Sequence, residues 1–361
     1  MVKVRNLAET GDLIHYLVVA EGPREGRWFE VPGQPMVIGR GEEADLDLDD
    51  RAVSGRHCRV RAEWDHLVVE DLGSMNGTYV NGKPLREPRE LPVGGRLQLG
   101  RSLLKHELRS RNEVQQQEEL TAELEKAAGY VRSLLPEPLD GEVVSTEWRL
   151  IPCAKLGGDA FGYDWLDDER FALYLIDACG HGTRSALHSV SVINDLRKQA
   201  LRKVDFGQPD QVLAALNRSF KMEEHGGMYF TIWYGIYHPS ERRLVFSAAG
   251  HPPALLVDED REVVGRLATT HPGIGLFEDI AYDASEVEVP AESRLYLYSD
   301  GAYELRTRED VQWTLEEFLE ILAGPSFGRG GELDRIEQAV REQMVTELFE
   351  DDFTLLITEF H

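Results

Sequence analysis

The side chains best suited to chemistry in this 361-residue sequence are carboxylates that stand where apolar segments begin or end. These positions are Asp177 after the apolar run 171–176, Asp300 after the run 295–298, the pair Asp351-Asp352 before the run 353–357, and Asp159 in the turn Gly157-Gly158-Asp159. A short apolar run bounded by turn residues is typical of a buried strand, and a carboxylate is costly to bury unless something neutralises it. Several carboxylates at strand ends suit hard divalent cations, which bind oxygen ligands.

A single aspartate before a helix also has an ordinary explanation. Asp177 is followed by Gly180 and Gly182 and then by apolar residues at helical spacing, so it could simply cap that helix. The same arrangement recurs at Asp300 and at residues 351–352, and this repetition favours a shared metal site.

Composition argues against several classes of protein. Hydrophobic residues make up 42% and charged residues 29% of the chain, as in ordinary soluble domains, and no run of 18 apolar residues indicates a membrane span. The N-terminal segment has no signal-peptide core, and Cys58, Cys153 and Cys179 are too isolated for a disulfide framework or a zinc site, so we expect a reducing cytoplasm. The net charge of −26 argues against partners such as nucleic acid or an anionic membrane.

The charge is distributed unevenly along the chain. Residues 1–108 carry 15 Lys and Arg against 18 Asp and Glu, whereas the remaining residues carry 24 against 47. Together with the patterns below, this predicts a nearly neutral domain at 1–108, a helical linker at 109–136 and a strongly acidic domain at 137–361.

Residues 1–108 contain many short alternating runs separated by turn residues, a pattern typical of an all-β sandwich. The motifs Gly39-Arg40, Ser54-Gly55-Arg56-His57 and 73–82 resemble those of the forkhead-associated (FHA) domain, and the resemblance covers the whole segment. It implies a module that binds phosphothreonine peptides through loops at one end of the sandwich.

The resemblance also implies which residues bind the phosphopeptide, namely Arg40, Ser54, Arg56 and Asn76. Arg40 and Ser54 would hold the phosphate and Asn76 the peptide backbone, while Gly39 and His57 would be architectural. Arginine suits this role because its planar fork can bind phosphate oxygens bidentately. Gly55 and Met75 depart from the family pattern at positions that are often polar, which predicts weaker binding. The alternative is a sandwich used only for docking or dimerisation.

Residues 109–135 contain no proline and are rich in Gln, Glu, Ala and Leu, and Pro136 ends the stretch. One face repeats at alternating spacings of three and four, as in a heptad seam: Gln117, Leu120, Leu124, Ala127, Val131 and Leu134. Two interpretations remain open, a homodimer formed through helix 109–135 and a connecting helix that packs on its own domain.

From residue 137 the sequence alternates apolar runs with helical patterns, which predicts α+β layers. We expect strands at 143–150, 159–165, 171–176, 229–237, 243–248, 253–257, 294–298 and 353–360, and helices at 184–202, 209–223, 314–323 and 332–349.

Five motifs in this region resemble, in family order, the SpoIIE/RsbU-like branch of the PPM (PP2C-type) protein phosphatases. They are Leu156-Gly-Gly-Asp159, Asp177-Ala-Cys-Gly-His-Gly182, Ala248-Ala-Gly-His-Pro-Pro-Ala254, Leu297-Tyr-Ser-Asp-Gly-Ala-Tyr-Glu304 and Asp351-Asp-Phe-Thr354. The resemblance implies an αββα sandwich and metal-dependent hydrolysis of phosphoserine or phosphothreonine. It also implies a role in bacterial signalling, with a phosphorylated anti-sigma-factor antagonist of the STAS type as substrate.

The same resemblance implies two Mn²⁺ or Mg²⁺ ions and their ligands. The residues are Asp159, Asp177, the carbonyl of Ala178, Asp300, and Asp351 or Asp352, with Asp159, Asp177 and Asp300 as the catalytic set. Asp177 would bridge the ions, Ala178 would bind one of them, and Asp159 would hold a water in the site. Two cations can activate a water and stabilise both oxygens of an in-line displacement, so no nucleophilic side chain is needed. The sequence does not separate the adjacent Asp351 and Asp352.

Other polar residues near these motifs have two interpretations each. His181 could protonate the leaving oxygen or be a turn residue, and Lys155 could meet the phosphate or remain solvated. Glu304 could help to orient Asp300 without binding a metal itself. Cys179 is expected to be a small apolar residue and not the nucleophile.

Two alternative functions compete with an active protein phosphatase. The first is an FHA-based scaffold with a degenerate phosphatase-like domain, and retention of the acidic positions disfavours it. The second is a phosphatase of small phosphorylated molecules, which the absence of a basic pocket motif disfavours.

Overall fold

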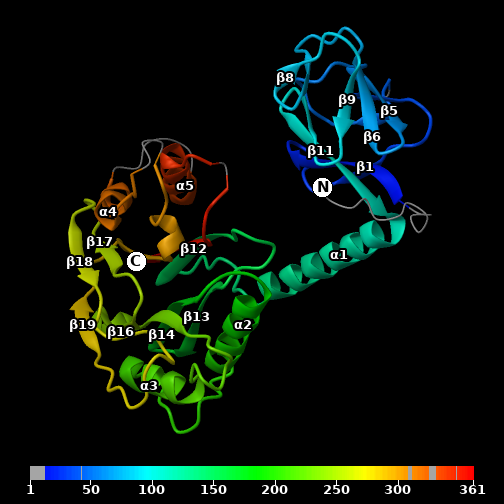
Figure 1. The fold of residues 1–361 in the computed structure, drawn as a ribbon. Helices are drawn as coiled ribbons and strands as arrows, with labels where there is room; N and C mark the ends of the chain where they lie inside the picture. The colour runs from blue at the N-terminus through cyan, green and yellow to red at the C-terminus, as the bar shows by residue number, and fades with distance from the viewer. Residues whose placement is uncertain (1–12, 42, 308–310, 325–330, 347) are drawn as a thin grey trace. The chain divides into compact units, whose positions relative to one another are not determined.

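The computed structural model describes residues 13–41, 43–307, 311–324, 331–346 and 348–361. The N-terminal segment that lacks a signal-peptide core, and residue 347 of the expected helix 332–349, lie outside this range. The chain divides into two compact units, an N-terminal unit that ends at Glu123 and a C-terminal unit that spans Leu124–His361. The boundary falls within helix α1 (Arg111–Ser133) (Figure 1).

The N-terminal unit is the expected β-sandwich. One sheet has the strand order β2-β1-β11-β10-β7-β8 and the other β4-β3-β5-β6-β9, and alternate residues of both sheets fill a single apolar core. The strands are β1 (Leu13–Glu21), β2 (Trp28–Glu30), β3 (Met36–Gly39), β4 (Leu46–Asp47), β5 (Cys58–Glu63), β6 (His66–Asp71), β7 (Thr78–Val80), β8 (Lys83–Pro84), β9 (Arg89–Pro92), β10 (Arg96–Leu99) and β11 (Ser102–Ser110).

Helix α1 follows β11 directly and is two residues shorter at each end than the expected helix 109–135. Its start is fixed by reciprocal hydrogen bonds, since the Ser110 N–H donates to the Glu113 carboxylate and the Glu113 N–H donates to the Ser110 hydroxyl. Of its residues only Val114 is buried, and Leu120 of the heptad seam is 50% exposed. The other apolar residues of the seam, Leu124, Val131 and Leu134, are half-buried. No described helix has both the length and the apolar character needed to cross a membrane.

The C-terminal unit is the expected αββα sandwich of two antiparallel sheets. The sheets have the orders β12-β21-β20-β17-β18 and β13-β14-β15-β16-β19. The strands are β12 (Val144–Ile151), β13 (Asp159–Asp167), β14 (Arg170–Ala178), β15 (Phe230–His238), β16 (Arg243–Ala249), β17 (Ala254–Val257), β18 (Val263–Leu267), β19 (Ser285–Glu288), β20 (Ser293–Tyr298) and β21 (Phe353–Phe360). The helices are α2 (Thr183–Arg197), α3 (Pro209–Ser219), α4 (Leu315–Ala323) and α5 (Glu332–Gln343), with short 3-10 turns η2 (Pro239–Glu241) and η3 (Asp300–Ala302).

Each sheet of this unit is covered by one helix pair (Figure 1). Helices α2 and α3 pack on the β13–β16 sheet, and α4 and α5 pack on the sheet that contains β12 and β17. The main apolar core lies between the sheets and beneath α2 and α3, and a second core lies beneath α4 and α5. This arrangement brings the ends of strands from both sheets to one edge.

The structure differs from the expected elements mainly at helix ends and edge strands. Helix α2 stops at Arg197 because the chain turns through a left-handed Gln199 (φ 47°), and α5 stops because Met344 is extended and bridges to Thr307. Helix α3 ends at Ser219, four residues early. The edge strands β18 and β19 were not expected because most of their residues are exposed, so no apolar alternation marks them.

Candidate functional site

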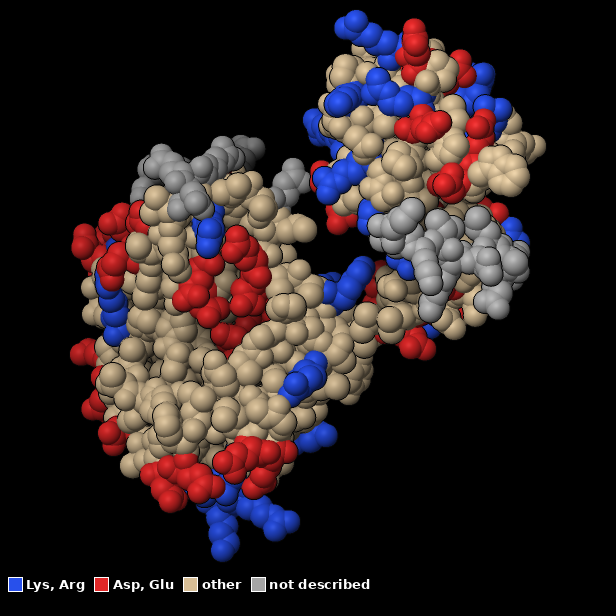
Figure 2. Space-filling model, in the orientation of Figure 1, with Lys and Arg blue, Asp and Glu red and all other residues tan. Residues whose placement is uncertain are grey.

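Strand pairing brings the predicted carboxylates to one edge of the C-terminal unit. Asp159 at the start of β13 pairs in register with Asp177 near the end of β14. Asp300 follows β20, and the pair Asp351-Asp352 precedes β21, the neighbour of β20 in the other sheet. Acidic side chains gather in a hollow on the face of this unit shown in Figure 2. The fold thus joins four separated motifs in one acidic cluster.

Three carboxylates of the cluster raise one another's pKa. Burial raises the pKa of Asp177 to about 8, and repulsion from Asp300 and Asp351 adds to the effect. Burial likewise raises the pKa of Asp300 to about 6, with contributions from Glu304 and Asp351. Within the described ranges no Lys or Arg forms an ion pair with them. An all-oxygen donor set with excess negative charge fits Mn²⁺ or Mg²⁺, because such cations supply the missing positive charge.

Asp159 is the most buried functional carboxylate on its sheet, 5% exposed. Burial raises its pKa well above the ordinary value, and the charges of Asp177 and Asp352 raise it further. The Thr354 hydroxyl donates a 2.6 Å hydrogen bond to Asp159 Oδ2. That bond fixes the orientation of the carboxylate beside Asp177.

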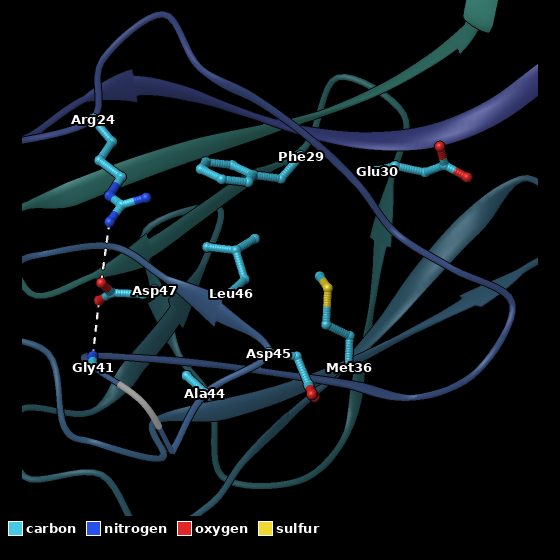
Figure 3. A pocket seen from close by; sticks show the side chains of 9 residues that line it. All are labelled: Arg24, Phe29, Glu30, Met36, Gly41, Ala44, Asp45, Leu46 and Asp47. Atoms are coloured by element: carbon cyan, nitrogen blue, oxygen red, sulfur yellow. Dashed lines mark hydrogen bonds and ion pairs between the residues drawn. The ribbon is translucent and has the colours of Figure 1, made fainter.

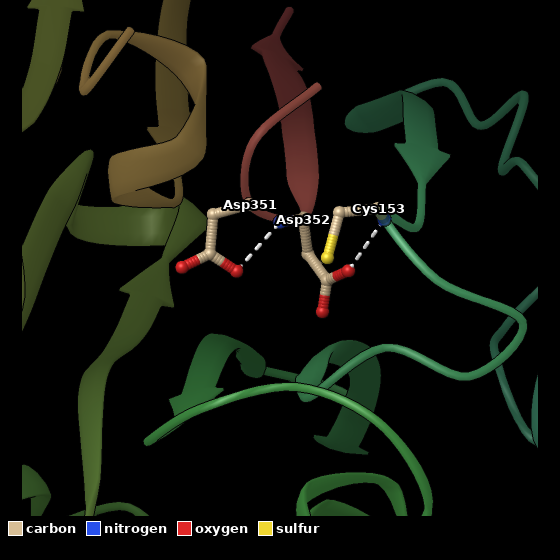
Figure 4. A group of neighbouring side chains, drawn as sticks. All are labelled: Cys153, Asp351 and Asp352. Carbon is tan, nitrogen blue, oxygen red and sulfur yellow. Dashed lines mark hydrogen bonds between the residues drawn. The ribbon is translucent and has the colours of Figure 1, made fainter. Parts of the chain in front are cut away.

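The adjacent Asp351 and Asp352 have different surroundings. Asp351 is exposed as a residue, yet its carboxyl is partly shielded from water by the surrounding protein, which raises its pKa. Asp352 is 2% exposed, and its carboxylate accepts the N–H groups of Cys153 at 2.8 Å and Gly158 at 2.5 Å. Figure 4 shows the two carboxylates leaving the chain in different directions, with the Cys153 thiol beside Asp352. One ligand atom from each of these three residues lies within 4.8 Å of the others.

The remaining predicted residues near the cluster are placed as follows. The carbonyl oxygen of Ala178 lies against the Gly158 backbone, where an added Cβ would approach it to 2.6 Å. His181 is exposed and close enough to Asp351 to lower the pKa of that carboxyl. Lys155 forms a 3.0 Å ion pair with Glu125 of α1, and both side chains are more than half exposed. It therefore sits as a solvated surface lysine in this structure.

Sequence reasoning missed three residues that surround the cluster. Thr354 and Cys153 contact Asp159 and Asp352 as described, and the Ser299 hydroxyl donates to the Asp352 carbonyl oxygen at 2.9 Å. Only Thr354 had a signal in the sequence, because a polar residue two positions after Asp352 points to the same face of a strand. Cys179, which the sequence marks as apolar, is partly buried with its sulfur 4.0 Å from that of Met228.

The predicted phosphopeptide residues lie on the loops that join strands of the N-terminal sandwich. Arg40 directly follows β3, and both Arg40 and Arg56 are exposed. The Ser54 hydroxyl accepts the Met75 N–H at 3.0 Å, and the Asn76 amide donates to the Ala52 carbonyl at 2.7 Å. These bonds tie the segment 50–56 to the segment 72–77, so the candidate residues share one end of the sandwich.

Two residues expected to be architectural hold these loops in shape. The buried His57 accepts the Ser54 N–H on Nδ1 and donates from Nε2 to the Gly77 carbonyl, which requires a neutral ring. Burial lowers the pKa of His57 and favours that neutral form. Gly39 lies against Gly55, where an added Cβ would stand 1.9 Å from the Gly55 carbonyl oxygen. Any larger residue at position 39 would separate the two binding loops.

The N-terminal unit also contains a cavity of about 490 Å³ (Figure 3). Its acidic side chains are already bonded: Asp47 accepts the Gly41 N–H at 2.8 Å and pairs with Arg24 at 3.0 Å, and Asp45 accepts the Val37 N–H. The carboxylates of Asp47 and Asp45 are thus held by an arginine or by backbone N–H groups, unlike that of Asp177.

Family models match two parts of the chain. Residues 167–361 match the model of Stage II sporulation protein E (SpoIIE), and residues 36–100 match that of the FHA domain. The two matches lie in the C-terminal and N-terminal units respectively.

Individual proteins match the same two parts. Phosphoserine phosphatase RsbP of Bacillus subtilis (strain 168) is 32% identical over 183 residues, 50% of this chain and 44% of RsbP. The FHA domain-containing protein FhaB of Mycobacterium tuberculosis (strain CDC 1551 / Oshkosh) is 36% identical over 89 residues, 25% of this chain and 57% of FhaB. The chain thus spans about half the length of the curated relatives it matches. The solved SiaA-PP2C domain of Pseudomonas aeruginosa shares the fold, with a TM-score of 0.58 and 21% identity over 68% of this chain and 98% of that domain.

Proposed function

Because the chain belongs to the SpoIIE family of PP2C-type phosphatases and carries an FHA domain ahead of its PP2C-type domain, we propose that it is a metal-dependent protein phosphatase. It hydrolyses phosphoserine or phosphothreonine on a partner protein. The observation that carries this proposal is the cluster of Asp177, Asp300 and Asp351, whose charges no described Lys or Arg neutralises. The similarity to a phosphoserine phosphatase supports the substrate class, and we propose a phosphorylated anti-sigma-factor antagonist of the STAS type as the partner.

The residues of the cluster divide the catalytic work. Asp177, the Ala178 carbonyl, Asp300 and Asp351 would hold two Mn²⁺ or Mg²⁺ ions. Bound there, such ions lower the pKa of a water and stabilise charge on the attacking and leaving oxygens. Asp159, fixed by the Thr354 hydroxyl, would accept a hydrogen bond from the attacking water and keep it in line.

The proton for the leaving oxygen needs a donor of its own. His181 is the candidate, since it is exposed and close enough to Asp351 to lower the pKa of that carboxyl.

The FHA domain would recruit a phosphothreonine partner. Arg40 and Ser54 would hold the phosphate, Arg56 would add positive charge, and Asn76 would bind the peptide backbone. The bonds that tie the 50–56 and 72–77 segments support this assignment, because they preorganise the loops before a ligand arrives. Helix α1 would carry the signal by pairing with a second chain through its heptad seam. The free thiols Cys58, Cys153 and Cys179 favour the cytoplasm as the compartment.

One assay distinguishes the proposed phosphatase from the alternative, an FHA scaffold with an inactive phosphatase-like domain. The full chain is tested for hydrolysis of an aryl phosphate, and then of phosphorylated substrate protein, with Mn²⁺ and with excess EDTA. Activity should need Mn²⁺, vanish in Asp177→Asn and persist in Cys179→Ala, the matched control at a neighbouring position. Undiminished activity in excess EDTA contradicts the metal mechanism, and no activity with either substrate favours the scaffold.

A further inference from the structure

The segment 153–159 is bonded to one carboxylate, that of Asp352. Asp352 Oδ1 accepts the Cys153 N–H at 2.8 Å, and Oδ2 accepts the Gly158 N–H at 2.5 Å and the Asp159 N–H at 3.4 Å. Both oxygens therefore already face backbone donors. A carboxylate held in this way has spent most of its accepting capacity on the protein and has little left for a cation.

The two glycines of the Gly-Gly-Asp turn match this arrangement. An added Cβ on Gly157 would lie 2.5 Å from Asp352 Oδ2 and 2.8 Å from its Cγ. An added Cβ on Gly158 would lie 2.6 Å from the Ala178 carbonyl oxygen. The turn thus lies pressed between the Asp352 carboxylate and the Ala178 carbonyl, and only glycine leaves room for both contacts.

A second set of bonds connects the start of β21 to Asp159. The Ser299 hydroxyl donates to the Asp352 carbonyl at 2.9 Å and accepts the Thr354 N–H at 3.0 Å. The Thr354 hydroxyl then donates to Asp159 Oδ2 at 2.6 Å. Asp352 fixes the backbone of Asp159, and Thr354 fixes its side chain. Asp351 Oδ1 accepts the N–H of Asp352 at 2.8 Å, whereas the N–H groups of the turn donate to Asp352.

We infer that Asp352 is a positioning residue and not a metal ligand, and that Asp352 and Thr354 together hold Asp159 in place while Asp351 of the adjacent pair faces the metal site. The role of Asp159 in catalysis rests on the proposed function. The division between Asp351 and Asp352 rests on the hydrogen bonds alone. It gives the two adjacent acids different tasks, because three of the roughly four acceptor sites of the Asp352 carboxylate already face backbone N–H groups.

The test compares Asp351→Asn with Asp352→Asn in the full chain. Mn²⁺ affinity is measured by calorimetry, and amide exchange of residues 153–159 by mass spectrometry. Asp352→Asn should speed exchange in this segment by about tenfold, because an amide presents its NH₂ to one set of donors, and should keep Mn²⁺ affinity within about threefold of wild type. Asp351→Asn should weaken Mn²⁺ binding by more than about 30-fold and leave exchange unchanged. The reverse pattern would overturn the inference.

Substitutions at position 354 provide a second test that leaves both aspartates in place. Thr354→Val removes the hydroxyl with little change of shape, and Thr354→Ser keeps it. We expect Thr354→Val to lower the turnover rate of Mn²⁺-saturated protein about tenfold with unchanged Mn²⁺ affinity, and Thr354→Ser to restore most of it. Equal turnover in both variants would contradict the role of Thr354. Calorimetry and exchange need no turnover, so a chain that binds Mn²⁺ in the expected pattern but hydrolyses nothing would refute the proposed function and not this inference.

Discussion

Asp71 in the FHA domain and Asp177 in the phosphatase domain are both partly buried carboxylates at the end of a strand, yet their environments are opposite. Burial alone would raise the pKa of Asp71, but hydrogen bonds from the Ser74 and Thr78 hydroxyls, both 2.6 Å, bring it below the ordinary value. Burial raises the pKa of Asp177 to about 8, and the charges of Asp300 and Asp351 raise it further.

The difference shows how one residue type serves two purposes. Where donors converge on the carboxylate, its charge is satisfied and it organises a loop, as Asp71 does for the 72–78 segment. Where acids converge, the charge is unsatisfied until a cation binds, and the site is poised for chemistry. Asp352 belongs with Asp71 by this criterion, although it stands next to Asp351.

The largest difference between the two carboxylates is expected when each is replaced by an amide, at Asp177 and at Asp71. Asp177→Asn should lower Mn²⁺-dependent phosphatase activity by more than about 100-fold, because it removes a charge from the proposed metal site. In EDTA it should leave the melting temperature equal or higher, since a repelling charge is gone. Asp71→Asn should leave activity intact and cost the FHA domain about 1–3 kcal/mol, since two hydroxyls lose a charged acceptor. If both variants only lower the stability of their domains, the two carboxylates do not have the different roles described above.

The proposed phosphopeptide site depends on Arg40, which is exposed in the FHA domain. Arg40→Ala should weaken binding of a phosphothreonine peptide by about 30-fold, the loss expected for a charge-assisted bond to phosphate. Arg59, which pairs with Glu70 on the sheet, is the matched control, and Arg59→Ala should bind normally. Fluorescence anisotropy with peptide libraries measures both. Equal affinity of Arg40→Ala and wild type would show that Arg40 does not hold the phosphate. Absence of binding by the wild type would show that the departures at Gly55 and Met75, the latter 90% exposed, have removed this function.

The two domains should respond to pH in opposite directions when no metal is bound. The lowered pKa of Asp71 contributes stability above its ordinary value of 3.8, and this is lost as the pH falls below that value. The raised pKa of Asp177 means that the folded state holds a proton more tightly than the unfolded chain, so stability falls as the pH rises from about 4 to about 8.

Calorimetry in EDTA should therefore show the phosphatase-domain transition shifting down by a few degrees between pH 5 and 8. The FHA transition should stay level over that range and drop only in acid. Asp177→Asn is the control that should flatten the first slope. A phosphatase-domain transition that rises with pH would show that the acids do not repel one another.

The smallest effect is expected at the seam of helix α1. Leu120→Glu with Leu124→Glu should change oligomeric state or specific activity by a few-fold, because coupling between sites is typically about 1–3 kcal/mol. The matched control is Ala122→Glu, which adds a charge on another face of the helix. Glu125 is left unchanged because it forms an ion pair with Lys155. Sedimentation and specific activity, with and without phosphopeptide, are the measurements. Identical values for all proteins would make α1 a passive spacer.

Much of this organisation could be predicted from local sequence signals. Turn pairs and alternation indicate the sandwich, and Asp177, Asp300 and Asp159 are marked by apolar runs and glycines that the fold then brings together. The ends of α2 and α5 could not be predicted, because a left-handed Gln199 and a bridge from Met344 to Thr307 depend on tertiary contacts. The different surroundings of Asp351 and Asp352 could not be predicted either, because the sequence does not show which backbone N–H groups each of two adjacent carboxylates will contact.

The metal centre is tested most directly by titrating Mn²⁺ into the full chain in a calorimeter, beside Asp177→Asn and Arg40→Ala. The wild type and Arg40→Ala should each bind about two ions per chain, and Asp177→Asn should lose the binding or weaken it by more than about 100-fold. Absence of Mn²⁺ binding to the wild type, or equal binding to Asp177→Asn, would contradict the assignment of this cluster as the metal site.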